Sequence, residues 1–261
     1  MAPPAASATG ALLAVVALTV SACLAALTAW RARHRGAPVA GADVAVGVAC
    51  LLWTAGVTGL ALDGLLGSGE GGEPDLTVAI LGTGAGGVAS AAFVLVRMGW
   101  SGAGLEWPGW RAVGAGVLLV PPFLAFSAVW VFALEWAGVA VEPQHLLAMV
   151  EGESSALVVA MVLLYGGLGA PLTEELLFRG LVLDALRVRL VGRAWVAIGI
   201  QGAAFGLVHG ADPAAVVPLT ILGVALGWLR LRTGSLWPAI VAHAANNWVA
   251  LALALSQVGA T

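Results

Sequence analysis

Long apolar runs recur along this chain, and each is about as long as the roughly 20 residues that a helix needs to cross the hydrocarbon core of a bilayer. We identify eight of them, at residues 10–30, 43–66, 76–96, 112–134, 155–186, 194–210, 213–229 and 237–256. Hydrophobic residues make up 61% of the chain and charged residues only 10%, which is far more apolar than a soluble domain of this length. The sequence predicts an all-α, polytopic membrane helix bundle of about eight transmembrane helices.

The charges predict how this bundle sits in a membrane. All 11 basic residues are arginines, and arginine-rich loops tend to stay on the cytoplasmic side. Every arginine except Arg179 fits one topology with both termini outside, so we expect a multi-pass protein of the cell membrane with the lipid bilayer as its surroundings. The net charge of −3 and the absence of a clustered basic patch argue against a nucleic-acid partner.

Polar side chains inside the later apolar runs are the main exception to this pattern. They are Glu174, Glu175, Arg179, His209, His243 and Asn247. Ionisable groups at membrane depth are costly and usually functional. These residues therefore form the candidate functional site.

The spacing of these residues from the arginine loops predicts that they share one depth. Glu174 lies roughly 20 Å along its helix from Arg187, at 1.5 Å per residue. The same arithmetic gives about 24 Å from Arg193 to His209. From Arg232 it gives about 17 Å to His243. We therefore expect the fifth, sixth and eighth runs to bring their polar groups together around an intramembrane cavity.

The two adjacent glutamates cannot share a direction, because successive residues of a helix are about 100° apart. Glu175 and Arg179 are four residues apart and lie on one face, so the arginine is expected to neutralise that carboxylate. Glu174 is then left for chemistry. Pro171, just upstream, is expected to bend the helix and open space beside the glutamates.

The two histidines suggest complementary tasks. His243 and Asn247 are also four residues apart, so both can point at one small ligand atom as hydrogen-bond donors. Such donors stabilise a carbonyl oxygen that becomes negative during attack. His209 can assist Glu174 in holding and deprotonating a water.

Three motifs carry a resemblance to a known family, and they span roughly residues 155–256. They are Glu174-Glu175-x-x-x-Arg179, Phe205-x-x-x-His209 and His243-x-x-x-Asn247. In order and spacing they resemble the motifs of the CAAX-protease and bacteriocin-processing (CPBP, or Abi) intramembrane endopeptidases, which are glutamic peptidases. The resemblance implies a hydrolase that acts on a peptide or membrane-protein substrate by intramembrane proteolysis.

The resemblance also implies a role for each motif residue. It implies that Glu174 and His209 activate the attacking water. His243 and Asn247 would form the oxyanion hole. No cofactor and no metal is then required.

The remaining two motif residues, Glu175 and Arg179, match structural or orienting positions of the family. The resemblance divides the single integral membrane domain into N-terminal transmembrane helices at 1–154, with the first four spans, and catalytic core helices at 155–261. The first four spans match the family only in being hydrophobic.

Several alternatives remain open at this level. The same residues could ligate zinc as a metalloprotease, although the compact HExxH pair that places two ligands on one helix is missing. A transporter also uses intramembrane carboxylates and histidines, but here the polar groups are confined to the second half of the chain. A non-enzymatic scaffold or immunity protein could retain the motifs for folding. The sequence does not specify whether a substrate would be prenylated.

Overall fold

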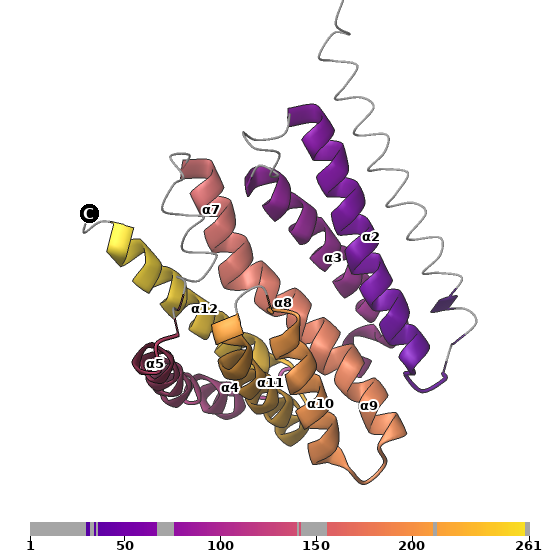
Figure 1. Cartoon of the computed structure of the whole chain (residues 1–261). Helices are drawn as coiled ribbons and strands as arrows, with labels where there is room; N and C mark the ends of the chain where they lie inside the picture. The colour runs from indigo at the N-terminus through magenta and orange to yellow at the C-terminus, as the bar shows by residue number, and fades with distance from the viewer. Residues whose placement is uncertain are drawn as a thin grey trace, which may run out of the picture.

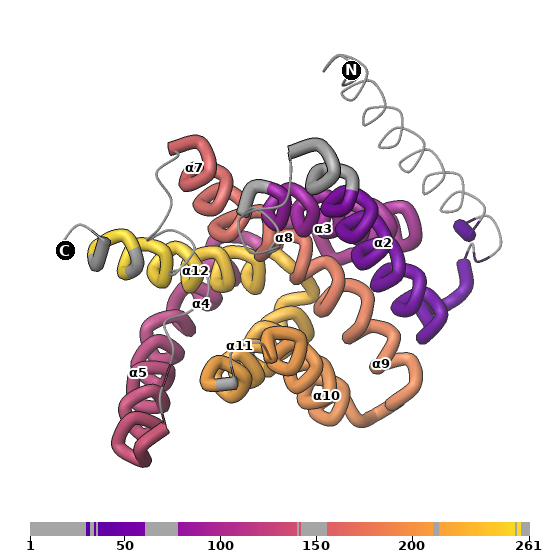
Figure 2. The backbone as a smooth tube through the Cα atoms, turned by 45° about the horizontal axis from the view of Figure 1, so that its top comes forward, coloured from indigo at the N-terminus to yellow at the C-terminus, as the bar shows by residue number. Residues whose placement is uncertain are grey.

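The structure is a computed structural model that describes residues 30, 31, 34, 36–66, 76–139, 141, 156–210 and 213–258. Every regular element within these ranges is a helix, and they contain no strand. The all-α prediction is therefore confirmed. Figures 1 and 2 show the helices packed together as a bundle.

The N-terminal part contains two long helices, α2 (Gly41–Leu66) and α3 (Leu76–Gly102), which run side by side in Figure 1. Small residues permit this contact. A Cβ atom at Gly86 would lie 2.5 Å from the carbonyl oxygen of Leu51, so only glycine allows the two backbones to approach this closely.

The helix α3 is kinked at Gly99, three residues before its end, where φ is 74°. The connection that follows leads into α4 (Trp110–Val117) and α5 (Val120–Trp136). It is fastened to the chain just before the last helix, because the N–H of Leu236 donates to the carbonyl oxygen of Gly104 at 2.7 Å. The helix α4 thereby packs beside α12.

One long helical span carries the glutamate motif and is interrupted by two π-helical segments. It consists of α7 (Ala156–Leu164), a π-helical segment η1 (Tyr165–Gly169), α8 (Ala170–Glu175), a second π-helical segment η2 (Leu176–Val182) and α9 (Leu183–Arg189). The main hydrophobic core surrounds η2, where Leu176 and Leu181 are almost fully buried.

The last three helices bring the other motifs to this span. They are α10 (Ala194–Leu207), α11 (Pro213–Thr233) and α12 (Trp237–Val258). The helices α10 and α11 form a hairpin whose upper end lies well below the start of α7 in Figure 1. At Gly202 and Gly223 the two helices touch backbone to backbone, since a Cβ at Gly223 would lie 2.8 Å from the Cα of Gly202.

The predicted spans and the observed helices agree in part. Within the described residues, five helical stretches are long and apolar enough to cross a membrane. They are Gly41–Leu60, Val78–Gly102, Trp110–Trp136, Ala156–Arg189 and Ala214–Thr233. The sixth predicted span is the shorter apolar helix Ala194–Leu207, and the eighth corresponds to α12. The first, at 10–30, lies almost wholly outside the described residues. The count of eight therefore stays a prediction.

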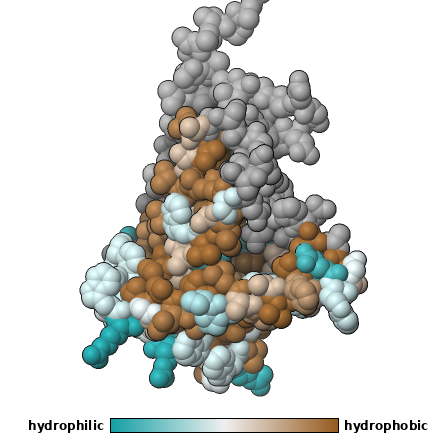
Figure 3. All heavy atoms as spheres, turned by 90° about the vertical axis from the view of Figure 1, so that its left-hand side faces the viewer, coloured by the Kyte–Doolittle hydropathy of each residue, from teal (hydrophilic) through white to brown (hydrophobic). Residues whose placement is uncertain are grey.

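The surface supports a membrane setting. Large apolar side chains point outward along the spans, with Leu60 at 77% and Phe132 at 67% exposure. In Figure 3 apolar residues form a broad area on one face, and strongly hydrophilic ones gather toward its lower end. Exposed arginines lie at helix ends that meet at one end of the bundle, among them Arg187, Arg193 and Arg232.

Candidate active site

The backbone around the two glutamates departs from regular α-helix on both sides. The N–H of Ala170 bonds to the carbonyl oxygen of Tyr165, and the N–H of Leu183 bonds to that of Phe178. Each bond spans five residues, which is the π-helical pattern, and such segments often mark functional sites. The sequence predicted a bend at Pro171 but missed these two segments. The glycine-rich stretch just before Pro171 was the available signal.

Glu175 and Arg179 form the buried centre of the site. The Nη1 atom of Arg179 lies 2.7 Å from Oε1 of Glu175, and both side chains are 0% exposed. The ion pair expected from the spacing is therefore present. Arg179 also donates from Nη2 to the carbonyl oxygen of Gly223 at 3.3 Å, and its guanidinium lies 4.3 Å from the ring centre of Phe205. These contacts compensate a charge that could not remain alone in an apolar interior, although Nε of Arg179 has no hydrogen-bond partner among the described residues.

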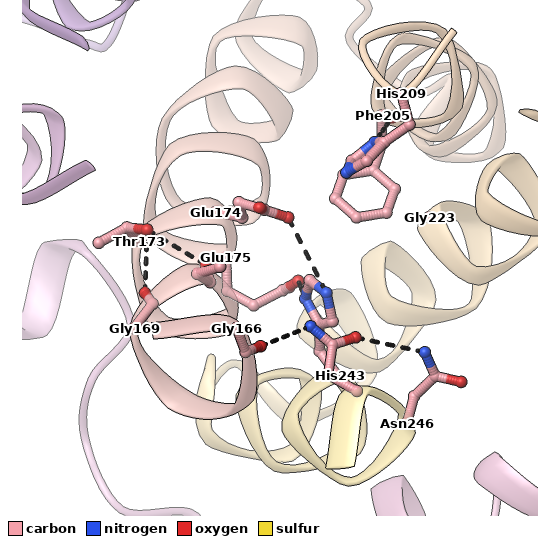
Figure 4. A network of polar contacts seen from close by, with 12 residues as sticks. Gly166, Gly169, Thr173, Glu174, Glu175, Phe205, His209, Gly223, His243 and Asn246 are labelled. Atoms are coloured by element: carbon pink, nitrogen blue, oxygen red, sulfur yellow. Dashed lines mark hydrogen bonds and ion pairs between the residues drawn. The ribbon is translucent and has the colours of Figure 1, made fainter. Parts of the chain in front are cut away.

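His243 lies between the two adjacent glutamates, as Figure 4 shows. Its Nδ1 atom is 2.8 Å from Oε1 of Glu175, and because a carboxylate can only accept, Nδ1 carries the proton. Its Nε2 atom is 3.9 Å from Oε2 of Glu174. The two carboxylates do point in different directions, since Glu174 is 29% exposed and Glu175 is fully buried. They reach opposite edges of the same imidazole.

His209 lies in the turn after α10, across from Glu174 in Figure 4. Its Nδ1 atom donates to the carbonyl oxygen of Phe205 at 2.8 Å, which leaves Nε2 of the neutral ring as an acceptor. The Phe205 ring is 5.0 Å from the His209 ring and 5.6 Å from the His243 ring, so it spaces the two histidines. Within the described part of the chain, no hydrogen bond or ion pair joins Glu174 directly to His209.

Asn247 lies one turn after His243 on α12. Its Nδ2 atom donates to the carbonyl oxygen of Gly166 in η1 at 2.8 Å, and its Oδ1 accepts from Nδ2 of Asn246 at 3.4 Å. His243 and Asn247, the two donors expected for an oxyanion, therefore each use one N–H in a contact within the protein. The link to Gly166 was not anticipated from the sequence.

Among the residues whose positions are described, no group of three or more His, Cys, Asp and Glu side chains has the geometry to hold a metal ion.

Comparison with protein families gives a match, which lies within the second half of the chain. Residues 156–249 match the family of type II CAAX prenyl endopeptidase Rce1-like proteins. The matched range contains all three motifs and begins at the first residue of α7. Comparisons with curated proteins and with solved structures gave no significant match. Over residues 156–249, the chain is therefore similar to type II CAAX prenyl endopeptidases of the Rce1-like family.

Proposed function

We propose that the protein hydrolyses peptide bonds within the membrane, with Glu174 as the general base and proton carrier. The observation that carries this proposal is the position of His243 between the two glutamates. Glu175 holds one nitrogen of the ring at 2.8 Å, and the other faces Glu174 at 3.9 Å. A partly exposed carboxylate thus lies beside a fixed hydrogen-bond donor, as peptide hydrolysis requires.

In the first step, Glu174 removes a proton from a water molecule while the water oxygen attacks the carbonyl carbon of the substrate. The electron pair of the carbonyl π bond moves to its oxygen, which becomes an oxyanion. His209 accepts a hydrogen bond from the same water at Nε2, the ring nitrogen that Phe205 leaves available. This orients the water for attack.

His243 and Asn247 stabilise the oxyanion. Asn247 has a second N–H on the amide nitrogen that bonds to Gly166. For His243 to donate from Nε2 while Nδ1 donates to Glu175, its ring must carry a positive charge. Two carboxylates, one guanidinium and one imidazolium then give a site of zero net charge, which suits an apolar environment.

In the second step, the oxyanion returns its electron pair to the carbon and the C–N bond breaks. Glu174 gives its proton to the leaving nitrogen and becomes a carboxylate again. The products are a carboxylic acid and an amine. No step requires a metal ion, and this metal-free mechanism is part of the proposal.

The test uses purified protein in liposomes and a peptide ending in a CAAX sequence, presented with and without its prenyl group. Glu174→Gln is expected to lower kcat by about 10³-fold or more, because the base is lost while the shape is kept. Glu135→Gln is the matched control, since Glu135 is exposed at the end of α5. Full activity of Glu174→Gln would contradict the proposal.

A second comparison uses His34 and His209, because each bonds through Nδ1 to the backbone carbonyl oxygen four residues before it. His34 donates from Nδ1 to the carbonyl oxygen of Trp30, four residues earlier, at 3.0 Å and stacks on its ring. His209 makes the same contact with Phe205. His209→Ala is expected to abolish most cleavage and His34→Ala to leave it unchanged. Equal effects would mean that His209 has only a packing role.

A further inference from the structure

The carbonyl oxygen of Gly166 has lost both of its regular backbone donors. In an α-helix it would accept from the N–H of Ala170, but that N–H bonds to Tyr165 instead. In the π-helical pattern it would accept from residue 171. That residue is Pro171, which has no N–H.

Asn247 supplies the missing donor from another helix. Its Nδ2 atom lies 2.8 Å from the Gly166 oxygen. Gly166 is buried, and a buried carbonyl without a partner is unfavourable in an apolar environment. The contact also fixes which end of the amide faces η1, because a carbonyl can only accept.

Residues next to this hydrogen bond also bring η1 and α12 into close contact. A Cβ atom at Gly167 would lie 2.6 Å from Cε2 of Trp248, so glycine is what allows the indole to lie against η1. Trp248 follows Asn247 directly in α12. The last helix is therefore seated on η1 by an aromatic contact and a hydrogen bond from adjacent residues.

We propose that Pro171 is a positioning residue for Asn247. By removing the N–H that would otherwise satisfy Gly166, the proline keeps that carbonyl available for the asparagine amide. One N–H of Asn247 is anchored in this way, and the second is held in a fixed direction. The inference rests on the proposed function for the use of that second N–H, whereas the Pro171–Gly166–Asn247 arrangement is independent of it.

Pro171→Ala tests the catalytic side of this inference. The new N–H can bond to Gly166 and release Asn247, so kcat is expected to fall by about tenfold with KM nearly unchanged. Pro218→Ala is the control, because Pro218 is also a buried proline inside a helix. In the Asn247→Ala background, Pro171→Ala is expected to have no further effect on kcat. Independent, multiplicative effects would overturn the proposal.

Thermal unfolding tests the arrangement without any activity assay. Asn247→Ala is expected to lower Tm by about 2–4 °C in the parent protein. In the Pro171→Ala protein the same change is expected to lower Tm much less, because the backbone N–H of residue 171 has taken over the carbonyl. An equal decrease in both backgrounds would overturn the proposal. Pro171→Ser restores the same N–H and allows the cycle to be repeated if Pro171→Ala does not fold.

The two assays separate the possible failures. A protein that cleaves nothing but shows the expected difference in Tm would refute the proposed function and leave the Pro171 arrangement standing. A protein that loses cleavage on Glu174→Gln but shows additive Tm effects would refute the arrangement alone.

Discussion

His243 donates a hydrogen bond from Nδ1 to Oε1 of Glu175 at 2.8 Å, joining residues that are 68 positions apart in the chain. The same carboxylate oxygen accepts from Arg179 at 2.7 Å. Glu175 thus fixes the orientation of the imidazole and is itself fixed by a buried cation. Its neighbour Glu174 faces the opposite edge of that ring. In the proposed mechanism, this arrangement gives the adjacent glutamates separate tasks.

The two glutamates should therefore respond differently to the same substitution. Glu175→Gln leaves Arg179 without its carboxylate in a fully buried position, and we expect a loss of about 3–5 kcal/mol in the free energy of unfolding. Glu174→Gln is expected to cost less than about 1 kcal/mol, because Glu174 is partly exposed. Denaturation of both purified variants measures this. Equal stability losses would contradict the assignment of structural and chemical roles.

Arg179 is expected to tolerate no replacement that removes its charge. Arg179→Met leaves Glu175 buried and unpaired, which should cost about 3–5 kcal/mol of stability. The control is Arg187→Met. The Arg187 side chain is 49% exposed, and its distance of 3.4 Å to Asp184 is longer than the 2.7 Å of the buried pair. Its cost should lie within about 0.5 kcal/mol. Comparable stability of the two variants would be inconsistent with the buried ion pair.

Gly202 is expected to be sensitive to the smallest possible side chain. A Cβ there would lie 2.6 Å from Cγ2 of Val224 and 2.8 Å from its nitrogen, so Gly202→Ala should push α10 from α11 at a cost of about 1–3 kcal/mol. At Gly199 on the same helix, a Cβ atom would have open space around it, with no heavy atom within 4 Å. Gly199→Ala should be neutral or stabilising by up to about 1 kcal/mol. A Tm that is unchanged by Gly202→Ala would argue against this close packing.

Removal of metal ions should leave the activity intact. In the mechanism proposed above both ring nitrogens of His243 carry protons and no step uses a metal, so EDTA and 1,10-phenanthroline are expected not to inhibit cleavage in liposomes. A known zinc protease treated in parallel confirms that the chelators act. Inhibition that added zinc reverses would replace the glutamate mechanism with a metalloprotease mechanism.

The sequence predicted the helical class and the convergence of the motifs, because both follow from simple regularities. Apolar runs of bilayer length require helices. The distance of Glu174 and His243 from flanking arginines placed them at similar depths, and the structure brings them within 3.9 Å of each other. The four-residue spacing of Glu175 and Arg179 likewise predicted their ion pair, because such residues are neighbours on any α-helix.

The remaining features depend on how different helices meet, which a sequence pattern does not specify. The contact of Asn247 with Gly166 requires that η1 is π-helical and that α12 packs against it at one position. Phe205 was noted only as part of a motif, yet its ring contacts Arg179 and both histidines. Such contacts arise from packing between helices that are distant in the chain, and local periodicity carries no information on them.

Arg179 touches three helices at once, since it pairs with Glu175 on its own span, bonds to Gly223 of α11 and lies on the ring of Phe205 of α10. A change at one of these contacts shifts the guanidinium of Arg179 and so disturbs its other two contacts. Divergence at positions 175 and 205, whose side chains contact this cation, should consequently be correlated among related chains, with paired replacements commoner than single ones.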